Sequence, residues 1–225
     1  MKTCKPILTF ALVLSALIGS GQRYHEFLDE YHYVKDIVNI PGRKTNDYAG
    51  IQGSPYLNSD FSQGIVVLKD SSAAKLPLRY NIYANDMEYI LNDNALAIGN
   101  PSALKFIILE NAMFIYLSYP ETRGYFEVLS DGKCQLLLKR NVEFQPQEGP
   151  KPIEGTIKPA QFRRLQDSYY IGLKGSEPVQ IRGTKTLLNV MQDQRATMEN
   201  YINSEKLKRA SKENLIKIVD HYNAL

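Results

Sequence analysis

The chain has 225 residues, with 27 Lys or Arg against 24 Asp or Glu, which gives a formal net charge of +3. Two of its lysines lie within the first 21 residues, and removing that segment leaves 25 basic against 24 acidic residues. Nucleic-acid binding depends on clustered basic side chains. The nearly neutral and interspersed charge therefore argues against a nucleic-acid partner.

The N-terminal segment has the order of residues of a secretory signal peptide. Lys2 and Lys5 precede an apolar run from Ile7 to Ile18, and small residues follow up to Gly21. A membrane-spanning helix needs roughly 20 apolar residues, and this run is shorter. We therefore expect cleavage near Gly21 and a secreted protein, periplasmic or extracellular, that is not an integral membrane protein.

Composition along the chain predicts five segments. They are a signal peptide at 1–21, an N-terminal extension at 22–50, an antiparallel β domain at 51–144, a Pro-rich linker at 145–160, and a β-hairpin followed by helices at 161–225. After cleavage a single cysteine, Cys134, remains, so no internal disulfide is expected.

The β domain contains three predicted hairpins. The first spans Leu78 to Ile90 and the second Lys105 to Leu117, whose strands are apolar on both faces and should be covered on two sides. The third spans Gly124 to Phe144 around an Asp-Gly turn. Counting from that turn sets Leu129 opposite Cys134 and Glu127 opposite Leu136. Cys134 then lies on the same face as Leu136, which predicts a small buried residue rather than a nucleophile.

Further strands are expected at Gly64 to Lys69 and Ala95 to Ile98. The predicted fold is mainly β, α+β overall, in which an antiparallel meander forms a sandwich or a curled, barrel-like sheet. The pattern does not distinguish these two shapes.

The C-terminal segment begins with a predicted hairpin of Phe162 to Leu165 with Tyr169 to Leu173, and Pro178 to Arg182 is a possible third strand. Two to three short helices follow, for which Thr184, Asp193 and Ser211 are the predicted N-caps. The last helix has an apolar stripe of Leu215, Ile216, Val219 and Tyr222, which we expect to pack on one end of the sheet rather than on a partner.

Residues that could perform chemistry are few. His25, Asp29 and His32 would share one face of a helix and could hold a divalent metal, but their spacing differs from the His-Glu-x-x-His motif and they lie near a new chain end. We expect no metal site, no cofactor and no catalytic residue there.

Two pairs of carboxylates, Asp60 with Asp70 and Asp86 with Glu88, could in principle perform glycosidic acid-base chemistry. Acids beside turns, however, are usually solvated. Tyrosine is abundant, with 15 residues, and tryptophan is absent. Aromatic faces can bind sugars or line a pocket, although tyrosine is also favoured in strands for packing. The tyrosines on or beside predicted strands are Tyr80, Tyr83, Tyr89, Tyr116, Tyr119, Tyr125, Tyr169 and Tyr170.

Several segments of the chain resemble a family of uncharacterised secreted β-rich proteins of Bacteroidetes-type bacteria. The resemblance rests on Gly53 to Leu57, Pro77 to Tyr83, Gly124 to Leu129, the Pro-rich linker and Leu215 to Asn223. It implies an exported protein of the cell envelope and carries no activity, cofactor or site residue.

Three functions remain open from the sequence. The first is a secreted, non-enzymatic binding or structural protein of the envelope, with an envelope protein, a glycan or a lipid as partner. The second is a periplasmic carrier of a hydrophobic or lipid ligand inside a curled sheet. The third is an enzyme of unfamiliar design, which would need several polar groups converging in a cleft.

Overall fold

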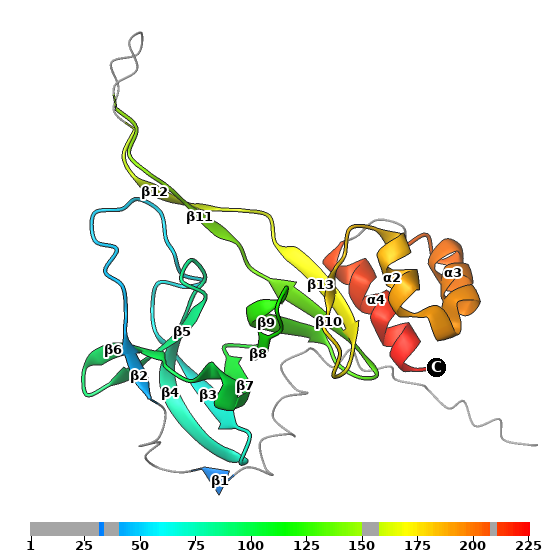
Figure 1. The fold of residues 1–225 in the computed structure, drawn as a ribbon, viewed down its shortest axis with the longest axis horizontal. Coiled ribbons are helices and arrows are strands. Elements are labelled where there is room, and N and C mark those ends of the chain that lie inside the picture. The colour runs from blue at the N-terminus through cyan, green and yellow to red at the C-terminus, as the bar shows by residue number, and fades with distance from the viewer. Residues whose placement is uncertain (1–31, 34–40, 150–157, 208–210) are drawn as a thin grey trace, which may run out of the picture.

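The protein is described by a computed structural model at residues 32–33, 41–149, 158–207 and 211–225 (Figure 1). The predicted signal peptide lies outside these residues. The strands are β1 (His32–Tyr33), β2 (Gly42–Lys44), β3 (Ser62–Leu68), β4 (Ser72–Asn81), β5 (Asp86–Leu91), β6 (Asn94–Ile98), β7 (Leu104–Leu109), β8 (Ala112–Ser118), β9 (Arg123–Ser130), β10 (Cys134–Lys139), β11 (Val142–Gln145), β12 (Gln161–Arg164), β13 (Ser168–Leu173) and β14 (Val179–Gln180). The helices are α2 (Thr184–Val190), α3 (Arg195–Ser204) and α4 (Lys212–Asn223), with short 3-10 turns at Pro101–Ala103 and Gln192–Gln194.

The fold is mainly β, as the sequence predicts. Twelve strands form one sheet. Eleven of them follow the order β14-β13-β10-β9-β8-β7-β3-β4-β5-β6-β2 in antiparallel pairs, and the twelfth, β1, pairs in parallel with β4. The sheet is open and does not close into a barrel. Strands β11 and β12 form a separate two-stranded ribbon that projects from the body (Figure 1).

The central strands curl around a core made by one face of the sheet. Its largest members, Tyr80, Phe114 and Tyr125, come from β4, β8 and β9 and are at most 2% exposed. The turn between β4 and β5 reaches β9, because the Oδ1 atom of Asn85 accepts the Tyr125 N–H at 3.1 Å. A side chain thus joins strands that are not neighbours in the sheet.

The predicted hairpin of β7 and β8 lies at the centre of the sheet. Strand β7 is largely buried on both faces, as expected, whereas β8 is mostly only partly buried. Ile107 and Phe114 belong to the inner core, whereas Phe106 and Ile108 pack with Val67 and Ala73 on the other face. The hairpin of β4 and β5 is also confirmed, since Leu78 pairs with Tyr89.

The predicted register of β9 and β10 is wrong. Leu136 pairs with Ser130 and Leu138 with Glu127, with an irregularity between Leu136 and Leu137. The backbone of Cys134, which the prediction pairs with Leu129, instead bonds to the side chain of Asn223 in α4. A contact from the far end of the chain therefore displaces the local pairing.

The pairing predicted for the C-terminal strands is also wrong. Strands β12 and β13 do not pair with each other, because β12 pairs with β11 and β13 with β10. Glu148 forms a further bridge to Lys158. The described parts of the predicted Pro-rich linker, 145–149 and 158–160, thus continue the pairing of β11 and β12, and we call residues 140–149 and 158–165 the arm (Figure 1).

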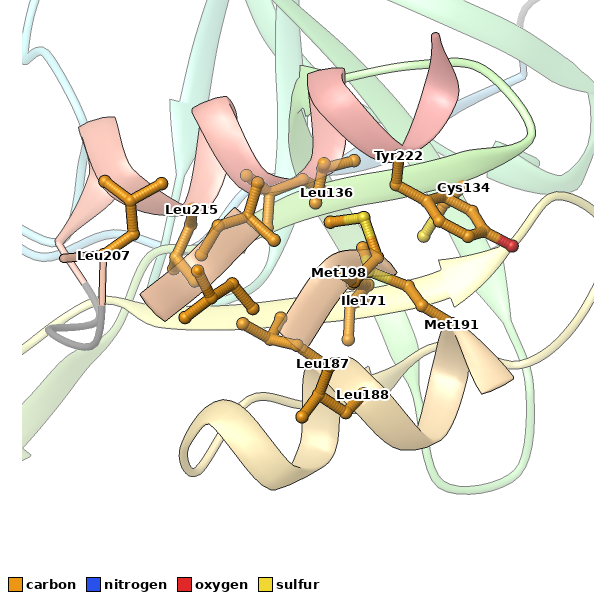
Figure 2. Packing of buried hydrophobic residues seen from close by; sticks show 13 residues of the cluster. Cys134, Leu136, Ile171, Leu187, Leu188, Met191, Met198, Leu207, Leu215 and Tyr222 are labelled. Atoms are coloured by element: carbon orange, nitrogen blue, oxygen red, sulfur yellow. The ribbon is translucent and has the colours of Figure 1, made fainter. Parts of the chain in front are cut away.

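The three helices cover the end of the sheet formed by β9, β10 and β13, as predicted. Leu136 and Ile171 of the sheet pack against Leu187, Met198 and Leu215 of the helices (Figure 2).

The predicted N-caps of the helices are partly correct. Ser211 caps α4 and accepts the Asn214 N–H. Thr184 is instead the first residue of α2, and Asp193 lies in a 3-10 turn. Among the described helices, none has the length and apolar character to span a membrane.

Candidate functional site

The helix that would bring His25, Asp29 and His32 to one face, as a metal site requires, does not include His32. This residue lies in β1, in register with Ser72, and His25 and Asp29 lie outside the described residues. Within the described ranges, no group of three or more His, Cys, Asp or Glu side chains is placed to hold a metal.

The first carboxylate pair is separated by a whole strand. Asp60 precedes β3 and Asp70 follows it, and a strand of seven residues spans about 23 Å. Asp70 accepts bonds from the hydroxyl and backbone N–H of Ser72, which lower the pKa of its carboxyl. Its role in the structure is to form the turn between β3 and β4.

The second carboxylate pair consists of two separately paired acids. Asp86 forms an ion pair with Arg43, whereas Glu88, 1% exposed, bonds to Arg79 at 2.6 Å and to the Asn81 amide at 2.9 Å. Each acid is held by its own arginine, an arrangement that stabilises strands rather than leaving an acid available for proton transfer.

Cys134 is buried, as expected from the sequence. Burial raises the pKa of its thiol to about 11, so the thiolate is scarce at neutral pH. Among the tyrosines listed from the sequence, Tyr80, Tyr89 and Tyr125 belong to the inner core, whereas Tyr83 is 44% exposed.

Tyr83 belongs to a group of rings at the base of the arm that sequence reasoning missed. Ring centroids lie 5.0 Å apart for Tyr83 and Phe162, 5.5 Å for Phe144 and Phe162, and 5.2 Å for Tyr48 and Phe162. Phe162 is buried beneath the others. We call this group the arm-base aromatic cluster, and its members are Tyr48, Tyr56, Tyr83, Phe144 and Phe162.

The cluster reaches the surface through two rings. Phe144 is 38% exposed and lies 6.3 Å from Tyr83, centroid to centroid. Large apolar side chains that gather at the surface on a rigid base are typical of binding surfaces. Tyr83 and Phe144 are therefore the candidate contact residues.

The two strands of the arm place their aromatic rings on one face, which also carries Val142 and Arg164, and polar side chains on the other. Phe144 is directly opposite Phe162 on the first face, and Glu143 is opposite Arg163 on the second. The Arg163 Nη2 atom lies 2.7 Å from Glu143, and this bond lowers the pKa of the Glu143 carboxyl. The alternation directs the rings of both strands toward the body.

The segment before β3 holds the arm from the other side. Gln52 accepts the Phe162 N–H at 2.8 Å and donates to the Ala160 carbonyl at 3.0 Å, in a parallel bridge. The next residue, Gly53, has a φ of +75°, and a Cβ atom there would lie 2.3 Å from the Phe162 carbonyl oxygen. Only glycine fits this close approach.

A buried ion pair lies against one ring of the cluster. The Arg79 guanidinium lies 3.7 Å from the centre of the Tyr56 ring and 4.3 Å from that of Phe61, while it bonds to Glu88. Burial, with the nearby Glu88 charge, raises the pKa of Tyr56. The phenol is therefore neutral at physiological pH, and its ring is fixed in place by the cation.

The base of the arm is tied to the body by a second arginine. Arg140 forms ion pairs with Glu127 of β9 and, at 3.1 Å, with Asp167. Lys212 of α4 lies 3.5 Å from the same Glu127. These contacts link the start of the arm to the sheet and to the last helix.

A shallow groove lies at the opposite end of the molecule, between β13, β14 and α2. Its volume is about 580 Å³, and Leu173 and Val179 expose apolar surface in it. At its rim, Asp193 accepts bonds from Lys133 and from the Tyr222 hydroxyl, which lower the pKa of its carboxyl. These polar groups are bonded to each other and do not converge on the space.

No protein-family model, no curated protein and no solved structure matches this chain.

The sequence contains one local signal for the missed cluster. Residues 142–145 alternate between apolar or aromatic and polar side chains, whereas 161–164 contain a single aromatic residue, Phe162, among polar ones. This period is typical of strands with one covered face. Tyr48 and Tyr83 have no such signal, since their neighbours come from distant parts of the chain.

Proposed function

We propose that this chain is an exported, non-enzymatic binding protein of the cell envelope that contacts its partner with the arm-base aromatic cluster. The observation that carries the proposal is the pair of exposed rings, Tyr83 and Phe144, fixed over a buried ring at the root of a projecting arm. Export is the expectation from the N-terminal segment and from the family resemblance.

The binding role is supported by the rigidity of the surface. A preformed aromatic surface loses little conformational entropy on binding. The rings are held by the Gln52 bridge to β12 and by Arg79 beneath Tyr56. Three of the acids that could do acid-base chemistry are instead bonded to other groups, Asp86 and Glu88 to arginines and Asp70 to turn backbone.

The carrier function receives less support than the binding role. A carrier needs an interior space of a few hundred Å³ for its ligand. The face of the curled sheet that would enclose such a space is filled by Tyr80, Phe114 and Tyr125, which pack ring against ring. Native mass spectrometry of protein purified from its own envelope tests this second candidate. A co-purified lipid would support the carrier function.

The proposal is tested with protein that begins at residue 22 and with isolated envelopes of cells that lack it. We expect the wild type to be retained by envelopes and the double variant Tyr83→Ser, Phe144→Ser to lose at least about tenfold in affinity, since each ring is an anchor worth about 1 kcal/mol or more.

The matched control is Leu91→Ser, which removes an equally exposed apolar side chain, 45% exposed, at the β5–β6 turn. This control should bind like the wild type. Equal retention of the wild type and the double variant would show that the cluster is not the binding surface.

A further inference from the structure

We infer that the partner is a polypeptide, and that it binds by adding an extended segment to the open edge of β11. This inference rests on the proposed function and specifies the chemistry of the partner. Among the described strands, β12 is the sole neighbour of β11. The other edge of β11 is the position that a further strand would occupy.

The direction of the backbone groups of β11 follows from its pairing with β12. In an antiparallel pair, residues alternate between bonding to the partner strand and pointing away from it. The Leu165 N–H donates to the Asn141 carbonyl, and the Phe162 N–H donates away from β11, to Gln52. In the same register, the N–H and C=O groups of Val142 and Phe144 point to the open edge.

The other edge of the ribbon already binds an extended residue in this manner, through an isolated bridge. Gln52 adds to β12 through two backbone bonds, of 2.8 and 3.0 Å. Unpaired backbone groups select an extended polypeptide over a glycan or a lipid, because a strand can satisfy alternating donors and acceptors at a regular spacing. The β11 edge presents the same pattern with no described strand on it.

The side chains of β11 define the sequence that would fit. An added strand would place alternate residues beside Phe144 on the face with the rings and beside Glu143 on the other face. The rings of Phe144 and Tyr83 would contact the first set. The expected segment therefore alternates between apolar or aromatic residues and polar residues over about four to six positions.

A second copy of this chain is a poorer occupant than a foreign segment. In an antiparallel self-pairing centred on Phe144, Val142 of each copy would be opposite Pro146 of the other. Pro146 has no N–H to donate, so a bond would be lost on each side. Proline at an edge is also a common protection against self-association.

The test uses Val142→Pro, which removes the outward N–H of Val142 while the bonds between β11 and β12 involve other residues. The matched control Val142→Ala shortens the same side chain but keeps the N–H. The probe is a displayed library of random ten-residue peptides selected on wild-type protein, and the recovered peptides are then synthesised and their affinities measured.

We expect the recovered peptides to alternate as described and to lose about tenfold in affinity for Val142→Pro, the effect of one lost backbone bond with added steric conflict. Val142→Ala should lose much less. If Val142→Pro does not fold, hydrogen exchange on the wild type replaces it, and the bound peptide should then protect the amides of Val142 and Phe144.

Three results would overturn strand addition. They are equal affinity of the peptides for Val142→Pro and the wild type, failure to recover any peptide that competes at this edge, and a dimer of the free protein that Val142→Pro dissociates. Envelope binding that requires Tyr83 and Phe144 but tolerates Val142→Pro would leave the proposed function standing and remove this inference alone.

Discussion

The side chain of Asn223, in the last turn of α4, replaces a strand partner for the backbone of Cys134. Its Oδ1 atom accepts the Cys134 N–H at 2.8 Å, and its Nδ2 atom donates to the Cys134 carbonyl at 2.9 Å. The two residues are 89 positions apart. The C-terminal helix thereby fixes the turn between β9 and β10, and with it the register of the hairpin.

Asn223→Ala should lower the free energy of unfolding by about 1 to 3 kcal/mol, because it leaves two backbone groups of the buried Cys134 without partners. Urea unfolding followed by circular dichroism measures this change. Asn203→Ala, which removes an exposed amide from α3, serves as the control and should have little effect. Equal stability of the two variants would mean that the Asn223 contacts contribute nothing.

The difference between the predicted and observed register has a physical cause. The Asp131-Gly132 turn is a local signal, and it correctly places the bend. The bonds from Asn223 come from a helix that no local pattern connects to Cys134. A Cβ atom at Gly132 would lie 2.7 Å from the Asn223 side chain, so the turn glycine also makes room for this contact.

The positions of strands were more predictable than their partners. Alternation and turn residues locate β4, β5, β7 and β8, whose hairpins join neighbours in sequence. Strand β12 pairs with β11, from which residues 146–160 separate it along the chain. For the same reason the arm-base cluster was missed, since Tyr48 and Phe162 are far apart along the chain.

Glu88→Gln should lower the free energy of unfolding by about 3 to 5 kcal/mol, because it breaks a buried ion pair and leaves the Arg79 charge uncompensated. Glu88 is 1% exposed. Chemical unfolding of the variant measures the loss.

The control for this change is Glu143→Gln, which breaks the exposed pair with Arg163. Exposed ion pairs contribute little to stability, so this variant should unfold close to the wild type. A smaller loss for Glu88→Gln than for Glu143→Gln would contradict the role given to the buried pair.

Cys134 should make the protein less stable in alkaline solution. The pKa of its thiol is about 11 in the folded chain against an ordinary value of 9.0, and burial is the main cause. As pH rises above 9, the unfolded chain loses this proton first, which favours unfolding. The stabilisation is complete below pH 9 and is lost as pH rises through about 11.

The measurement compares wild type with Cys134→Ala between pH 8 and 11. The alanine variant lacks the titrating group, so the stability difference between the two proteins should narrow as pH rises. A difference that stays constant over this range would show that the thiol does not titrate with folding.

The binding role of the arm-base aromatic cluster can be tested most directly inside the intact envelope. A photoreactive benzophenone amino acid is placed in turn at Tyr83, Phe144 and the control position Leu91, and cells that export each protein are irradiated. We predict a discrete cross-linked product from the first two positions and none from Leu91. No product at Tyr83 and Phe144, or the same products from all three positions, would contradict the account.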